Sequence, residues 1–206
     1  MSQDLGFIHR FEPGTSGDTL LVLHGTGGDE NDLIPLARQM APESNLLSPR
    51  GQVIENGMPR FFRRLDIGVF DEADLTERVL DLGRFVRAAS KHYGFEPARV
   101  RALGYSNGAN TAAAMLLLDP ALLEGAALLR AILPLTPPGK PDLSGRSVLI
   151  AAGRRDPFAP IERVEALASR LKEAGASVDL RWSDRGHELA PEEIDATADW
   201  LDALRR

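Results

Sequence analysis

Short apolar segments alternate with helical patterns along the whole chain. Buried strands are expected at residues 19–23, 45–48, 99–103, 125–133, 147–151 and 178–182. Helices are expected at residues 33–40, 75–89, 107–118, 161–171 and 191–201. Strands and helices that alternate at this spacing predict a mostly parallel central sheet with helices on both faces, the α/β class.

Length and composition narrow the function classes. The chain has 206 residues, which suits a single domain spanning residues 1–206. It contains no cysteine, so disulfides, thiolate metal sites and a cysteine nucleophile are excluded, and a cytoplasmic location is expected. The net charge of −6 argues against binding to nucleic acid or anionic lipid. No apolar run approaches the roughly 18 residues of a membrane span, and residues 1–10 lack a signal-peptide pattern.

A Gly-x-Ser-x-Gly pattern, made by Gly104, Ser106 and Gly108, lies between an expected strand and an expected helix. A sharp turn at this place exposes a serine hydroxyl, and flanking glycines avoid side-chain collisions there. By chance alone the pentapeptide occurs in roughly one of ten to twenty chains of this length, so its context carries the argument. The pattern predicts Ser106 as a nucleophile, with a solvated serine in a chance turn as the alternative.

A glycine-rich loop, His-Gly-Thr-Gly-Gly at residues 24–28, follows the first expected buried strand. Acyl transfer builds negative charge on a carbonyl oxygen, which backbone N–H groups stabilise. We expect these donors to be Thr26 and Asn107, the residue after the serine. A phosphate loop is the alternative, but the final glycine of G-x-G-x-x-G is missing and Asp29 and Glu30 would repel a phosphate.

The general base and its acid are sought at strand ends, because sites in open α/β sheets lie at the carboxyl ends of the strands. His187 follows the last expected strand, and Asp156 follows the strand before it. The chain order Ser, Asp, His suits a catalytic triad. Asp156 has an alternative role as a helix cap, and Asp184 is a rival acid. Structural places are expected for the remaining histidines: His9, His24 and His92.

Five segments resemble the phospholipase/carboxylesterase family, which also contains acyl-protein thioesterases, and its small bacterial branch in particular. They are HGTGGDENDL (24–33), SPRGQVIENGMPRFF (48–62), GYSNGAN (104–110), AAGRRDP (151–157) and RGHEL (185–189). The resemblance implies the α/β-hydrolase fold, ester hydrolysis without cofactor or metal, and often a homodimer. It implies catalytic roles for Ser106, Asp156 and His187, and oxyanion roles for Thr26 and Asn107. Many relatives carry leucine in place of Thr26, which affects pocket shape more than chemistry.

The substrate pocket is expected to be open. The stretch between Ser106 and Asp156 is used by a helix, a strand and a loop, which leaves no room for a large cap domain. Residues 49–71 show no clear periodicity and carry three candidates for binding substrate: Met58, Phe61 and Phe62. The same side chains have the alternative of pinning this long segment to the core.

Arg130 interrupts an otherwise apolar expected strand near its carboxyl end. A guanidinium at this place binds a carboxylate of the substrate in one interpretation. In the other it is a snorkelling arginine with a partner at the surface.

The main hypothesis is a serine esterase that hydrolyses short-chain carboxylic esters through an acyl-enzyme. Acyl thioesterase, lysophospholipase and lactone hydrolase activities share this mechanism and remain alternatives. A non-catalytic small-molecule receptor on the same fold is the hypothesis from another class. A fluorophosphonate probe separates the receptor from the enzymes, because only an activated serine reacts with it quickly.

Overall fold

The centre of the structure is a seven-stranded sheet with the order β1-β3-β2-β8-β9-β10-β11. The computed structural model describes residues 5–204. Residues 1–4, part of the segment in which no signal peptide is expected, lie outside the described residues. β1 pairs antiparallel with β3, and every other neighbouring pair is parallel. The strands are β1 His9–Glu12, β2 Thr19–Leu23, β3 Asn45–Pro49, β8 Val100–Tyr105, β9 Gly125–Leu129, β10 Ser147–Gly153 and β11 Ser177–Ser183. The predicted, mostly parallel sheet is confirmed.

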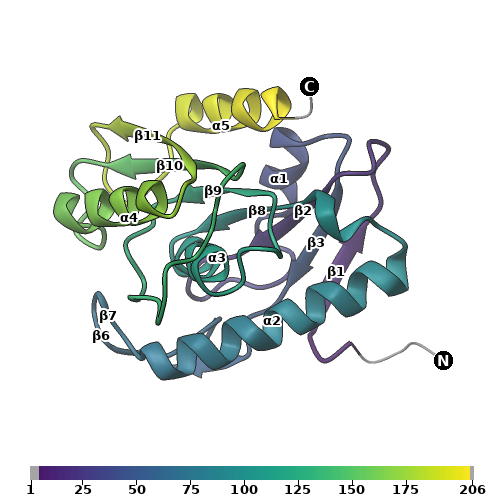
Figure 1. Cartoon of the computed structure of the whole chain (residues 1–206), viewed down its shortest axis with the longest axis horizontal. Helices are drawn as coiled ribbons and strands as arrows, with labels where there is room; N and C mark the ends of the chain where they lie inside the picture. The colour runs from purple at the N-terminus through teal and green to yellow at the C-terminus, as the bar shows by residue number, and fades with distance from the viewer. Residues whose placement is uncertain (1–4, 205–206) are drawn as a thin grey trace.

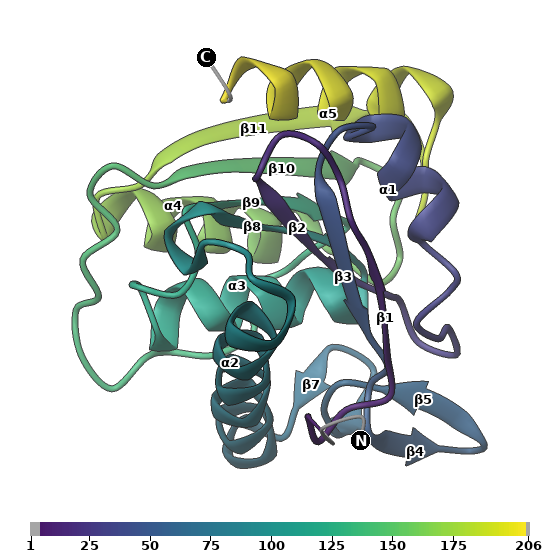
Figure 2. The same cartoon turned by 90° about the vertical axis from the view of Figure 1, so that its right-hand side faces the viewer.

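Helices cover both faces of the sheet (Figure 1, Figure 2). They are α1 Ile34–Met40, α2 Glu72–Tyr93, α3 Asn107–Leu118, α4 Ile161–Glu173 and α5 Pro191–Ala203, with a 3-10 turn η1 at Pro97–Arg99. Leu20 and Val22 of β2 pack in the cluster that contains α1 and α5. Leu21 and Leu23 pack in the cluster that contains α2, α3 and α4. Successive residues of one strand therefore face two cores, as expected of a sheet buried on both sides.

β9 is shorter than the sequence predicts. The apolar run continues to residue 133, but the strand ends at Leu129. Arg130 follows with φ 64°, a left-handed conformation that turns the chain out of the sheet. The chain remains buried past the turn, so its residues there are still apolar. In the sequence, this apolar run cannot be distinguished from a longer strand.

The segment at residues 49–71, expected to be irregular, forms two small antiparallel hairpins, one labelled in Figure 2 (β4 and β5) and one in Figure 1 (β6 and β7). One hairpin pairs β4 Val53–Glu55 with β5 Met58–Arg60, and the other pairs β6 Arg64–Asp66 with β7 Val69–Phe70. Strands this short show no detectable alternation, so the sequence pattern does not reveal them. Within residues 5–204, no helix combines the length and the apolarity that crossing a membrane requires.

Candidate active site

Ser106 lies at the sharp turn between β8 and α3, where the glycine pattern predicts it. Its backbone has φ 54° and ψ −113°, a region that residues other than glycine rarely adopt. A Cβ at Gly104 would lie 2.6 Å from the backbone nitrogen of Ala109. A Cβ at Gly108 would lie 2.0 Å from the carbonyl oxygen of Leu23. The turn can hold the serine in this place only because both flanking positions are glycines.

The side chains of Ser106, His187 and Asp156 form one hydrogen-bonded chain. His187 Nε2 lies 2.8 Å from Ser106 Oγ, and His187 Nδ1 lies 2.7 Å from Asp156 Oδ2. The Asp156 side chain is fully buried, and its Oδ1 accepts a hydrogen bond of 2.8 Å from the backbone N–H of Phe158. An ionised carboxylate only accepts hydrogen bonds, so Nδ1 carries the ring proton. Nε2 is then free to accept the proton of the serine hydroxyl.

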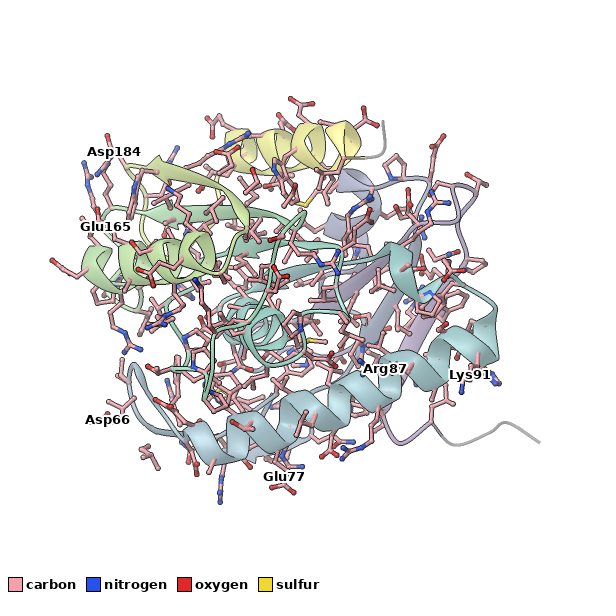
Figure 3. All side chains as sticks on the ribbon, in the orientation of Figure 1. Asp66, Glu77, Arg87, Lys91, Glu165 and Asp184 are labelled. Carbon is pink, nitrogen blue, oxygen red and sulfur yellow. The ribbon has the colours of Figure 1, made fainter. Side chains whose placement is uncertain are left out.

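Asp156, rather than the rival Asp184, provides the carboxylate that contacts the histidine. Asp184 lies just past β11 at the outer edge of the molecule (Figure 3). Ser106, Asp156 and His187 follow β8, β10 and β11, whose carboxyl ends meet at one edge of the parallel sheet. In the described part of the chain, no group of three or more His, Asp or Glu side chains is placed to hold a metal ion.

The loop at residues 24–28 packs directly against the serine turn, since a Cβ at Gly25 would lie 3.6 Å from the carbonyl oxygen of Tyr105. His24 holds this loop in place. Its Nδ1 donates to the carbonyl of Gly25 at 2.7 Å, and its Nε2 accepts from the N–H of Gly51 at 2.9 Å. Burial lowers the pKa of His24, against the opposing effect of the Gly25 carbonyl. The ring is therefore neutral and structural, as expected from its place at a strand end.

The two predicted oxyanion donors have free N–H groups. Among the hydrogen bonds between described residues, none uses the backbone N–H of Thr26 or of Asn107. The next N–H along the loop, that of Gly27, is occupied by the carbonyl of Pro59 at 2.9 Å. The Asn107 side chain accepts from the N–H of Phe61 at 2.8 Å, which joins the serine turn to the segment at residues 49–71. Free N–H groups beside the serine are what an oxyanion site requires.

The prediction that Phe61 and Phe62 bind substrate is wrong. Their side chains are 3% and 0% exposed and belong to the core that contains α2, α3 and α4. Phe62 packs edge-on against Phe70, with ring centroids 5.0 Å apart. These rings pin their segment to the core, which is the alternative that the sequence leaves open. Met58 is 38% exposed and lies next to Gly27 of the loop at residues 24–28, so it remains a candidate for contacting substrate.

The prediction that Arg130 binds substrate is also wrong. Its side chain is completely buried and forms an ion pair of 2.7 Å with Glu193 of α5. Its remaining donors point to backbone carbonyls of the protein. The alternative of a snorkelling arginine fails as well, because no part of the guanidinium reaches solvent.

Two aromatic residues against His187 are not singled out by the sequence patterns. Phe158 is 48% exposed, and its ring centroid lies 5.1 Å from that of His187 in an edge-on arrangement. Tyr105 donates its hydroxyl to the carbonyl of His187 at 2.9 Å. Burial raises the pKa of Tyr105, so the phenol stays protonated and keeps this bond. The available signal is adjacency, since Tyr105 precedes Ser106 and Phe158 lies two residues after Asp156.

Comparison with known proteins gives close relatives that match over nearly the full chain, although no family model matches it. The hydrolase MhqD of Bacillus subtilis (strain 168) is 45% identical over 192 residues, which cover 93% of this chain and 96% of that protein. The carboxylesterase structure from Bacillus cereus has a TM-score of 0.94 and 44% identity, covering 97% of this chain and 95% of that chain. The carboxylesterase structure from Mesorhizobium loti has a TM-score of 0.91 and 34% identity, covering 97% and 96%.

These similarities confirm the resemblance inferred from the five sequence segments. At 97% coverage of this chain, they include the sheet and both helical layers. The chain therefore belongs to the small carboxylesterase branch of the α/β-hydrolases and is a carboxylic ester hydrolase.

Proposed function

We propose that this carboxylesterase hydrolyses short-chain carboxylic esters through an acyl-enzyme formed on Ser106. The observation that supports the proposal is the hydrogen-bonded chain in which Nε2 of His187 lies 2.8 Å from the serine Oγ and Nδ1 lies 2.7 Å from Asp156. A serine hydroxyl becomes a nucleophile when a positioned base removes its proton as it attacks. The buried carboxylate keeps the imidazole in the required tautomer and stabilises its cationic form.

The proposed reaction has two steps. Ser106 Oγ attacks the ester carbonyl carbon while His187 takes the hydroxyl proton, and the carbonyl oxygen accepts hydrogen bonds from the N–H groups of Thr26 and Asn107. His187 then gives the proton to the leaving alkoxide, which departs as the alcohol and leaves the acyl group on Ser106. In the second step His187 deprotonates a water molecule that attacks the acyl-enzyme, and the proton returns to Ser106 as the acid leaves.

The proposal of short acyl chains rests on the shape of the site. In the described chain, residues 106–156 contain one helix, α3, so no inserted helical cap covers the serine. Exposed apolar surface comes from Met58 beside the oxyanion loop and from Phe158 against His187. Two separate side chains give less enclosure than the pockets that bury most of a larger ligand. A small ester therefore suits this site better than a long acyl chain.

The decisive experiment is the substitution Ser106→Ala, assayed with p-nitrophenyl acetate. We expect kcat/KM to fall by about 10⁴-fold or more with the fold intact, and labelling by a fluorophosphonate to disappear. The control is Ser144→Ala, which changes an exposed serine in the loop before β10 and should leave kcat/KM unchanged. Activity that survives Ser106→Ala contradicts the proposed nucleophile, and absence of turnover in the wild type favours a receptor.

A substrate series tests the remaining part of the proposal. p-Nitrophenyl esters of increasing acyl length should show kcat/KM falling beyond the short chains. Acyl thioesters and lysophospholipids of matched length serve as the competing substrates. A higher kcat/KM for a long acyl ester or for a thioester would replace the short-chain ester with that class.

We also propose that the protein is a cytoplasmic homodimer. The absence of cysteine from the sequence supports a reducing compartment. The family resemblance supports the dimer. Light scattering coupled to size-exclusion chromatography measures the mass in solution, and a mass equal to one chain contradicts the dimer.

A further inference from the structure

We infer that Arg130, paired with Glu193, is a positioning residue that fixes the loop carrying His187 and thereby sets kcat. The inference rests on the proposed function, in which His187 moves the protons. Neither Arg130 nor Glu193 bonds to the imidazole or to Ser106, so both act through the backbone around the histidine.

The guanidinium of Arg130 donates hydrogen bonds to the backbone on both sides of His187, in the loop between β11 and α5 (the histidine loop). Its Nε donates to the carbonyl of Gly186 at 2.9 Å, and its Nη2 donates to the carbonyl of Glu188 at 2.5 Å. Because these two carbonyls flank the histidine, a rotation of the backbone at residue 187 disturbs at least one of the two bonds. The distance from Nε2 to the serine Oγ therefore depends on a side chain that is itself fully buried.

The other N–H groups of Arg130 donate to the central sheet and to α5, so they fix the guanidinium itself. Nη1 donates to the carbonyl of Ala151 in β10 at 3.2 Å and to Glu193 Oε1 at 2.7 Å, while Nη2 donates to Glu193 Oε2 at 2.8 Å. Arginine has five N–H donors, and here each has an acceptor. Lysine has three donors around a single nitrogen and cannot reach the same acceptors.

Glu193 joins the two ends of the loop. Its carboxylate accepts from the hydroxyl of Ser183 at the end of β11 at 3.1 Å and from the N–H of Ala190 before α5 at 2.9 Å. Burial acts to raise the pKa of Glu193, but the hydrogen bonds from Arg130 and Ala190 outweigh it and the pKa lies below its ordinary value. Glu193 is therefore ionised at neutral pH, and its pair with Arg130 connects the sheet, the histidine loop and α5.

The backbone at Arg130 supports the same interpretation. Its φ of 64° is a conformation that favours glycine, yet the chain places an arginine there. Such strain persists where the surroundings hold it, and it often accompanies a functional constraint. A glycine would relieve the strain but would provide none of the bonds to the carbonyls on either side of His187.

The test is the double variant Arg130→Met/Glu193→Leu, which removes both charges and leaves no unpaired ion in the core. With p-nitrophenyl acetate we expect kcat to fall by about 10- to 100-fold while KM changes by less than about twofold, since a displacement near 1 Å has this effect on rate. A low-field proton NMR signal from the Nδ1–H of His187, assigned by its loss in His187→Gln, should broaden or disappear.

The matched control is Arg101→Met. Arg101 is also a buried arginine, ion-paired with Glu124 at 2.8 Å and bonded to the carbonyl of Leu204, but it lies near the amino end of β8, away from the histidine loop. We expect this variant to lose stability and to keep the kcat and the low-field signal of the folded enzyme.

Glu193→Gln is the milder variant and decides the matter if the double variant does not fold. It leaves Arg130 bonded to the carbonyls, and we expect kcat to fall a few-fold at constant KM. Wild-type kcat and an unchanged low-field signal in the folded variants would overturn the inference, as would an equal loss of kcat in Arg101→Met. Either result, with Ser106→Ala inactive, leaves the proposed function standing, whereas an active Ser106→Ala refutes the proposed function itself.

Discussion

The two sides of the active site are each held by a buried arginine, but the two arginines are used differently. On the side of the base, Arg130 makes two hydrogen bonds to Glu193 and uses every remaining donor on backbone carbonyls. On the side of the oxyanion loop, Arg60 lies 3.1 Å from Glu55 Oε2 and donates to the hydroxyl of Thr26 at 2.6 Å. Of these two arginines, only Arg130 bonds to loop backbone next to a residue of the proposed catalytic triad.

Charge compensation also differs between the two sides. Glu55 Oε2 is buried without a well-aligned hydrogen bond, and the other oxygen of Glu55 is bonded to Arg64 at 2.8 Å. Burial lowers the pKa of Arg60, and the nearby Glu55 only opposes this effect. Beside His187, one ion pair with every donor bonded acts together with the Tyr105 hydroxyl. The loop at residues 24–28 is held instead by separate bonds from His24, Pro59 and Arg60. We therefore expect substitutions on the base side to affect kcat more strongly.

On the base side, Asp156→Asn should lower kcat more than any substitution at the two arginines. An amide in place of the carboxylate favours the wrong tautomer of His187, so kcat should fall by about 10⁴-fold while the fold is retained. Steady-state kinetics with p-nitrophenyl acetate measures the loss. Asp184→Asn, at the rival acid, is the control and should stay within about twofold of wild type. Similar losses in both variants would remove Asp156 from its assigned role.

A smaller effect is expected for Arg60→Met on the oxyanion side. Thr26 loses a hydrogen bond, but Glu55 keeps Arg64 as a partner, so kcat should fall by less than about fivefold, below the range expected for the Arg130/Glu193 double variant. The free energy of unfolding should fall by about 1–3 kcal/mol, which urea denaturation measures. Thr26→Val removes the hydroxyl alone and should change kcat by less than about threefold. A loss for Arg60→Met as large as that of the Arg130/Glu193 double variant would make the two sides equivalent.

The same contrast explains which parts of the site the sequence predicts. Ser106, Asp156 and His187 each follow a strand, and parallel strands bring their carboxyl ends to one edge, so strand order alone is sufficient. Arg130 also follows a strand, but its left-handed backbone turns the side chain into the core. Phe62 lies in a segment whose hairpin strands are too short to show a period. The sequence therefore predicts which residues lie near the carboxyl edge of the sheet. It does not predict whether a side chain there points into the site or into the core.

A weaker effect is expected in how the free energy of unfolding depends on pH. His24 and Glu193 should lose their contributions in different pH ranges. Burial lowers the pKa of His24 on the oxyanion side below its ordinary 6.5, so the unfolded chain takes up this proton first. The stability that His24 contributes is complete above pH 6.5 and is lost as the pH falls through the folded pKa. The pKa of Glu193 lies below 4.5, so its contribution is complete above pH 4.5 and is lost as the pH falls through the lower, folded value.

As the pH falls, the stability contributed by His24 should therefore be lost at a higher pH than the stability contributed by Glu193. The free energy of unfolding, measured by urea denaturation between about pH 7 and pH 3, should fall in two ranges for the wild type. His24→Gln should flatten the range that begins near pH 6.5, and Glu193→Gln should flatten the range below pH 4.5. If His24→Gln leaves the upper range unchanged, neutral His24 is not what holds the oxyanion loop. The difference between the two sides of the site would then be explained by Arg60 and not by His24.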